Sequence, residues 1–122
     1  MKVAGLFLAA ATLVLSTAAF AEGDAAAGQV VFRKCAVCHN IEPDKNKVGP
    51  SMHGIVGKKS ASDPKFAYSA GMKAYDVTWT PETLFVYLEK PQQLVKGTKM
   101  VFAGLPSEKE RRDLIAYLAT LK

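Results

Sequence analysis

An all-α fold, with three to five short helices joined by long loops, is predicted by three features of the sequence. Helix-start residues stand at four places, and three of these precede apolar stripes of helical spacing. No segment has the alternation of apolar and polar residues that is typical of a half-buried strand. Residues 40–68 and 92–106 lack both periods and contain several Gly and Pro, which predicts loops.

The first helix is expected at residues 24–34, because Asp24 is a favourable N-cap. One face of this helix contains Gly28, Val31, Phe32 and Cys35, which recur at i, i+3, i+4 and i+7. A Gly in the apolar face lowers helix stability, so its presence indicates the close approach of another backbone.

Two helices are expected in the middle of the chain, a short one at residues 69–75 and a longer one at 80–90. Thr80 is a good N-cap for the longer helix, and Pro81 suits its first position. Pro91 is expected to stop it, because Pro cannot continue the hydrogen-bonding pattern. The apolar side of this helix contains Leu84, Tyr87, Leu88 and Pro91.

The last helix is expected at about residues 108–121. Ser107 and Glu110 form a capping-box pattern at its start. Its apolar stripe contains Leu114, Tyr117, Leu118 and Leu121. We expect this stripe to pack against the apolar face of the first helix.

The first 21 residues have the parts of a secretory signal peptide. An apolar core follows Lys2 and runs to Leu15, and Ala19-Phe20-Ala21 is a small-x-small cleavage site. The apolar core has about 13 residues and a membrane-spanning helix needs about 20, so cleavage is favoured over retention as a membrane anchor. The sequence therefore predicts a signal peptide at 1–21, one domain at 22–122, and export to the periplasm.

The formal charge of +5 is moderate, and the basic residues are scattered rather than gathered in the stripe that a nucleic-acid binder needs. We therefore expect no nucleic-acid partner. Two interpretations of the basic surface stay open. It is either an ordinary solvated surface or an electrostatic face for an acidic protein partner.

The stretch Cys35-Ala36-Val37-Cys38-His39 matches C-x-x-C-H, the attachment signature of a c-type haem. Two thiols can add across the two vinyl groups of a haem, and the adjacent His can reach the iron from the same side. A zinc site would lack ligands, because the chain has two Cys and two His. A thioredoxin-like dithiol follows a strand rather than a helix, and a disulfide would leave His39 without a role.

A haem would also explain the two long loops, because it would supply the apolar core that they surround. Its iron needs a sixth ligand, an open position or water. Met52, Met72 and Met100 are candidates, and Met100 is favoured because a core Met is less expected in its Gly- and Lys-rich loop. His53 is interpreted as a surface or loop-fastening residue.

Further motifs follow in one order along the chain: Gly49-Pro50, Gly54, Gly57, Phe66-x-Tyr68-Ser69, Trp79, Thr83-Leu84, Tyr87-Leu88, Pro91, Gly97 to Gly104, Arg111, and Asp113 to Leu118. With C-x-x-C-H, they resemble class I c-type cytochromes of the cytochrome c2 and mitochondrial cytochrome c type. The resemblance covers about residues 22–122. It implies the cytochrome c fold, wrapped around one covalently bound haem.

The resemblance also implies a role for individual residues. Cys35 and Cys38 would hold haem c, with His39 and Met100 as the axial iron ligands. The Pro50 carbonyl would accept a hydrogen bond from the second ring nitrogen of His39 and so fix its tautomer.

Four aromatic residues complete the implied site. Tyr68 and Trp79 would donate to a buried haem propionate. Tyr87 would lie beside the Met100 sulfur, and Phe102 beside the haem edge. The first and last helices would cross at Gly28, Phe32, Leu114 and Tyr117, as in the family.

This chain departs from the family's pattern at several positions. Lys58 stands where relatives often have Arg near a propionate, and Lys lacks the rigid fork of Arg. Gln92 and Gln93 replace lysines that flank the haem edge in mitochondrial relatives. The remaining candidate docking residues are Lys34, Lys96 and Lys99.

The predicted function is that of a soluble periplasmic one-electron carrier, not an enzyme, between respiratory or photosynthetic redox complexes. Partners would dock transiently at the exposed haem edge. We expect a monomer without stable membrane insertion. Two alternatives stay open: a peroxidase-like haem enzyme, which needs an open sixth position, and a haem-free dithiol oxidoreductase.

Overall fold

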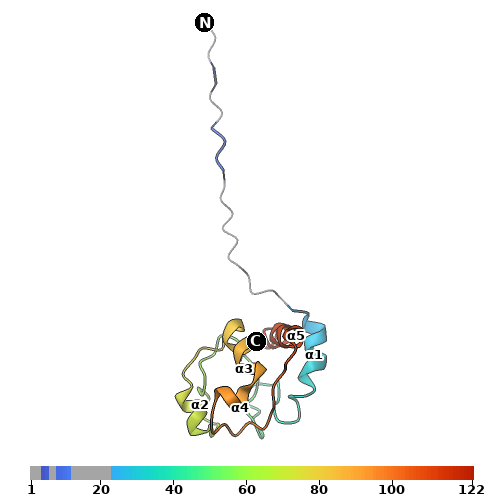
Figure 1. Ribbon diagram of the computed structural model, residues 1–122, viewed down its shortest axis with the longest axis vertical. Helices are drawn as coiled ribbons and strands as arrows, with labels where there is room; N and C mark the ends of the chain where they lie inside the picture. The colour runs from blue at the N-terminus through green and yellow to red at the C-terminus, as the bar shows by residue number, and fades with distance from the viewer. Residues whose placement is uncertain (1–3, 6–7, 12–22) are drawn as a thin grey trace.

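The structure is a computed structural model, and it describes residues 4–5, 8–11 and 23–122. Its helices are α1 (Ala25–Phe32), α2 (Ala70–Ala74), α3 (Pro81–Glu89), α4 (Pro91–Leu94) and α5 (Glu108–Leu118). The described part contains no strand, and one isolated bridge joins Lys59 to Thr78. The all-α prediction is therefore confirmed (Figure 1). The expected cleavage site at Ala19–Ala21 lies outside the described residues.

Helix α1 begins where the sequence predicts and ends two residues earlier than expected. The Asp24 carboxylate accepts from the backbone N–H groups of Ala26 at 2.9 Å and Ala27 at 3.3 Å. After Phe32 the bonding becomes tighter, because Arg33 N donates to Val30 O, three residues back. Residues 33–38 therefore form turns and do not continue the α-helix.

Helix α3 has a reciprocal cap, in which the Thr80 hydroxyl accepts from Thr83 N and the Thr83 hydroxyl accepts from Thr80 N. Pro91 ends α3 as expected, but it also starts α4, so the prediction of an irregular 92–106 segment is wrong at its beginning. Pro fits the first position of a helix because the N–H it lacks would have no partner there.

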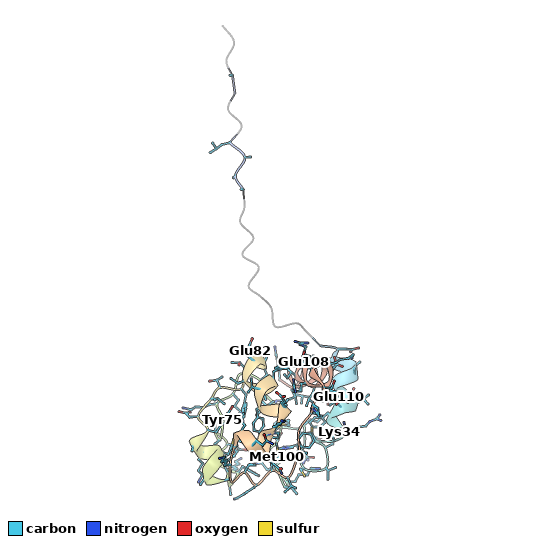
Figure 2. All side chains as sticks on the ribbon, viewed as in Figure 1. Lys34, Tyr75, Glu82, Met100, Glu108 and Glu110 are labelled. Carbon is cyan, nitrogen blue, oxygen red and sulfur yellow. The ribbon has the colours of Figure 1, made fainter. Side chains whose placement is uncertain are left out.

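Helix α5 has half of the predicted capping box. The Ser107 hydroxyl accepts from Glu110 N at 3.2 Å, and the reciprocal bond is absent from the described residues. The Glu110 carboxylate instead lies 3.7 Å from Lys34 Nζ, across the gap to the end of α1. Figure 2 shows these two side chains on the same flank of the domain.

The predicted crossing of α1 and α5 is confirmed (Figure 1). A Cβ atom on Gly28 would lie 1.8 Å from the Asp113 carbonyl oxygen, so only Gly permits this approach. The rings of Phe32 and Tyr117 lie 5.4 Å apart at the same crossing. Asp24 N donates to the Asp113 carboxylate at 2.8 Å and joins the two ends of the fold.

One apolar cluster connects the helices. Its buried members are Val31, Phe32, Trp79, Leu84, Tyr87, Leu88, Val95, Leu105, Leu114, Ile115, Tyr117 and Leu118. These residues come mainly from α1, α3 and α5, with Val95 and Leu105 from the segment 95–106 and none from residues 40–68. Those two segments surround the cavity described next.

Candidate functional site

A single cavity brings together every predicted site residue. It contains about 1330 Å³ free of protein atoms, a volume that includes open solvent. Its wall includes Cys35, Cys38, His39, Pro50, Tyr68, Trp79, Tyr87, Met100 and Phe102. The structure therefore brings these nine side chains together around one cavity.

The two cysteines lie on the turn that follows α1. Cys38 N donates to Cys35 O at 3.0 Å, and His39 N donates to the same carbonyl at 2.9 Å, so one helix-like turn presents all three side chains. Both thiols are free and half-buried. Burial raises the pKa of the Cys35 thiol above its ordinary value. A reactive dithiol depends on a lowered thiol pKa, so this environment argues against the oxidoreductase alternative.

The His39 ring is held from two sides. Its Nδ1 lies 2.7 Å from the Pro50 carbonyl oxygen, which fixes Nδ1 as the N–H donor and leaves Nε2 as the nitrogen able to bind a metal. A Cβ atom on Gly49 would lie 2.3 Å from His39 Cε1, so the Gly49 backbone lies flat against the ring. Burial lowers the pKa of His39, which favours the neutral, ligating form.

Met100 lies in the cavity wall with a hydroxyl beside its sulfur. Tyr87 Oη donates to Met100 Sδ at 3.7 Å. Burial raises the pKa of Tyr87 far above its ordinary value, so the hydroxyl stays protonated as a donor. Met52 and Met72 also line the cavity, but neither has such a donor among the described contacts. His53 is not among the lining residues.

Tyr68 and Trp79 have polar groups in the cavity wall that the protein does not fully use. The Tyr68 hydroxyl accepts from Asp63 N at 3.2 Å, so its own proton remains available to donate. Trp79 is 6% exposed, and its indole N–H has no hydrogen-bond partner among the described residues. An acceptor inside the cavity would therefore pair with donors that this wall already offers.

These features fit a covalently bound haem. Two thiols and an imidazole nitrogen come from one turn, and a thioether comes from the facing loop. The wall between them is apolar and aromatic, and it offers donors to acidic groups at Tyr68 and Trp79. Covalent attachment would use Cys35 and Cys38.

The loop at residues 41–51 is joined to the cavity rim by two hydrogen bonds of one side chain, which the sequence did not predict. Asn46 Nδ2 donates to the Asp63 carboxylate at 2.9 Å, and the Asn46 side-chain oxygen accepts from Ser51 N at 2.9 Å. Donation from Asn46 and from the Lys65 N–H lowers the pKa of Asp63, so its carboxylate stays charged beside the cavity. No local pattern predicts a bond between such distant segments.

The candidate docking lysines differ in the partners that their side chains contact. Lys34 is 55% exposed at its side chain and pairs with Glu110, while Lys96 is exposed. Lys99 Nζ donates to the Ala67 carbonyl at 3.1 Å. Lys58 lies in the cavity wall, as expected for a residue near a propionate.

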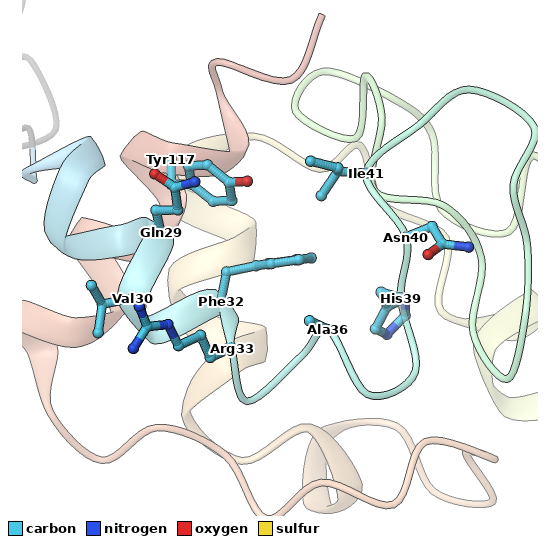
Figure 3. A pocket seen from close by; sticks show the side chains of 9 residues that line it. All are labelled: Gln29, Val30, Phe32, Arg33, Ala36, His39, Asn40, Ile41 and Tyr117. Carbon is cyan, nitrogen blue, oxygen red and sulfur yellow. The ribbon is translucent and has the colours of Figure 1, made fainter.

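A second hollow lies on the other side of His39 (Figure 3). Phe32 and Tyr117 form one wall of it, and His39, Asn40 and Ile41 form the facing wall. None of the cysteines or methionines lines this hollow, and His39 is shared with the first cavity.

Comparisons with known proteins agree with this site. The profile of the Cytochrome c family matches residues 25–122. The chain is 46% identical over 121 residues to cytochrome c2 of Rhodomicrobium vannielii, covering 98% of this chain and 97% of that one. It is 50% identical over 101 residues to cytochrome c of Tetrahymena pyriformis, covering 82% and 91%. Among solved structures, cytochrome cH from Methylobacterium extorquens matches with a TM-score of 0.76 and 43% identity, covering 80% of this chain and 99% of that one.

Proposed function

The chain belongs to the cytochrome c family, and from this premise we propose that it is a soluble periplasmic one-electron carrier whose haem iron is bound by His39 and Met100. Family membership makes the protein an electron carrier with covalent haem c rather than an enzyme. The proposal adds the two axial ligands, the compartment and the way partners dock.

One observation carries the choice of ligands. His39 and Met100 line the same cavity as both thiols, and each has a hydrogen-bond partner: the Pro50 carbonyl at His39 Nδ1 and the Tyr87 hydroxyl at Met100 Sδ. The bond to Pro50 leaves His39 Nε2 free, and the Met100 sulfur keeps a second lone pair beside the one that accepts from Tyr87. Such outer contacts fix the orientation of ligands and tune a metal.

When bound, the haem supplies an iron that changes between Fe(II) and Fe(III). A thioether ligand and an apolar cavity both favour Fe(II), which raises the reduction potential relative to bis-His ligation. Fixed His39 and Met100 side chains would change little between the two states, so reorganisation would be small. Tyr68 and Trp79 would hold a propionate, and Phe102 would cover the haem edge.

Docking would take place at the exposed haem edge. Lys34, Lys96 and Lys99 would attract an acidic partner in a respiratory or photosynthetic chain, through a small and short-lived interface. The exposed Lys96 is the freest of the three.

The compartment rests on the sequence. A signal peptide cleaved after Ala21 would release a chain beginning at Glu22, and periplasmic export suits a protein whose thiols must stay reduced until haem is attached. Among the residues that the structure describes, no helix has the length and apolar character to cross a membrane. The mass of the purified protein tests whether the signal peptide is cleaved, and a pyridine-haemochrome spectrum tests whether the haem is covalently attached. The expected result is a start at Glu22 and haem joined by two thioethers.

The ligand assignment is tested with Met100→Ala. The unmodified oxidised protein should have the far-red absorption band of a Met–iron bond. The variant should keep covalent haem but lose this band and become high-spin, because the sixth ligand is gone. Met52→Ala and Met72→Ala are matched controls and should keep the band. If either control loses the band while Met100→Ala keeps it, the assignment is wrong.

A further inference from the structure

Arg111 is a buried cation in a position that does not favour one. Its side chain is 3% exposed, and it is the fourth residue of α5, near the positive end of the helix dipole. Its Nε has no hydrogen-bond partner among the described residues. Burial of a charge is costly. The requirements of the helix therefore do not explain an Arg here, whereas its contacts outside the helix do.

The Arg111 guanidinium joins α5 to the end of the loop that carries Met100. Nη1 donates to the Leu105 carbonyl at 2.8 Å and lies 3.4 Å from the Pro106 carbonyl oxygen. The Glu89 carboxylate lies 3.9 Å away, and the Phe85 ring centroid lies 4.3 Å from Cζ. Helix α3 supplies both Phe85 and Glu89, so one side chain connects two helices and the loop.

The loop end that Arg111 holds is itself tightly fixed. Leu105 is 1% exposed, and its N–H donates to the Leu88 carbonyl at 2.8 Å. Gly104 has a φ of +109°, and a Cβ atom there would lie 2.0 Å from the Glu89 carbonyl oxygen. Residues 104–106 are therefore held against α3 and α5 with little freedom.

Met100 has much weaker restraints of its own. Its N–H donates to the Thr98 hydroxyl at 3.2 Å, and its carbonyl accepts from the exposed Gln92 amide at 3.3 Å. Besides the Tyr87 hydroxyl, which lies 3.7 Å from the sulfur, the position of the thioether therefore depends on where the two ends of its loop are fixed. Val95, 2% exposed, fixes the first end, and the contacts of Arg111 fix the second.

We propose that Arg111 is a positioning residue for Met100. Its bonds to the Leu105 and Pro106 carbonyls keep the loop closed and the thioether at the iron. This inference rests on the proposed function, in which Met100 is the distal ligand. Without the guanidinium the two carbonyls lose a buried donor, the loop end loosens, and the sixth position of the iron becomes accessible more often.

Imidazole affinity measures how accessible the sixth position of the iron is, because imidazole binds the iron when the Met100 sulfur dissociates from it. The oxidised holoprotein is titrated with imidazole in the unmodified form and in Arg111→Met and Arg112→Met. Arg112 is a matched control: it is adjacent, lies 5.3 Å from the same Phe85 ring, and pairs with Glu108 in its own helix at 3.6 Å. We expect Arg111→Met to bind imidazole about tenfold tighter or more, and Arg112→Met to stay within about twofold, because the charged donor to the Leu105 and Pro106 carbonyls is lost only in the first.

Two further variants separate positioning from general stability. Arg111→Lys keeps the charge and can replace one of the two bonds, so we expect an intermediate imidazole affinity. If Arg111→Met does not fold, Arg111→Lys replaces it in the comparison with Arg112→Met. Leu114→Ala weakens the buried α1–α5 contact and should lower the unfolding temperature without a comparable gain in imidazole affinity.

The outcomes are distinct. If the unmodified protein lacks the far-red band, Met100 is not the ligand, and both the proposed ligation and this inference fail. If the band is present but Arg111→Met and Arg112→Met bind imidazole equally, only the role of Arg111 is overturned. The same holds if Leu114→Ala gains as much affinity as Arg111→Met.

Discussion

At the scale of single residues, Gly49 determines how the proximal side of the site is built. Its backbone lies against the His39 ring, and its N–H donates to the Cys38 carbonyl at 2.8 Å. The ring therefore has the Gly49 backbone on one face and the Pro50 carbonyl at Nδ1. A side chain at position 49 would change the orientation of the ligand without changing the ligand itself.

We expect Gly49→Ala to displace the His39 ring, because the added methyl group would lie 2.3 Å from Cε1. The overpacking should lower the free energy of unfolding by roughly 1–3 kcal/mol. It should also change the low-spin electron paramagnetic resonance signal, since the bond to Pro50 weakens.

Gly54→Ala is the matched control for this change. Its φ of +68° makes Ala unfavourable there, but no atom beyond its two chain neighbours lies within 4 Å of the added methyl group. It should lower stability and leave the resonance signal unchanged. An unchanged signal in Gly49→Ala as well would mean that Gly49 does not orient the ligand.

At the scale of the helices, Asp113 fastens α5 to the start of α1. Its carboxylate accepts from Asp24 N at 2.8 Å and from Lys109 Nζ at 2.5 Å. Donation from Lys109 and from the Asp24 N–H lowers the pKa of Asp113. A carboxyl whose pKa is lowered on folding stabilises the fold above its unfolded pKa of about 3.9, and this contribution is lost as pH falls through the folded pKa.

Asp113→Asn should therefore be less stable than the unmodified protein at pH 7, and the difference should narrow as the pH falls below about 4. Thermal unfolding followed between pH 2 and pH 7 measures this, with pH values in about unit steps. Asp76→Asn is the control, because Asp76 forms an exposed ion pair with Lys59 and should contribute little. A difference that stays constant with pH would contradict the role assigned to the Asp113 charge.

The sequence predicted the starts of four helices because each depends on a local cap. The side chains of Asp24, Ser69, Thr80 and Ser107 all accept backbone bonds as N-caps. Helix α4 was not predicted because Pro91 both ends α3 and begins α4, and a Pro at the end of a helix does not by itself indicate that another helix follows. Local patterns fixed where most helices begin, but they did not determine how the chain continues after a stop.

At the scale of the whole molecule, the residue types of the site were predictable and its supporting contacts were not. C-x-x-C-H is a contiguous motif, and Met100 lies in a recognisable loop. The contacts of Arg111 with Leu105 and of Asn46 with Asp63 join different segments. Such contacts depend on the packing of the entire chain, which periodicity and capping do not specify.

The cavity predicts that the fold depends on its cofactor. We expect a Cys35→Ala/Cys38→Ala double variant to lose covalent haem, since no thiol remains to form a thioether. The two long loops would then lose the apolar body they surround, and near-ultraviolet circular dichroism should weaken. Ser62→Ala, at another position in the cavity wall, is the control and should keep both haem and signal. A double variant as stable as the unmodified protein would contradict this dependence.

The crossing of α1 and α5 has a consequence for how the chain is delivered. The first helix can be completed only by the last, and Asp24 bonds to Asp113, 89 residues away. Contacts of such high sequence separation slow folding, because a long loop must close before they form. In a chain threaded through a membrane with its N-terminus first, Cys35 and Cys38 emerge long before α5 does. If the chain is exported in this way, the two thiols would be on an unfinished domain until α5 has emerged.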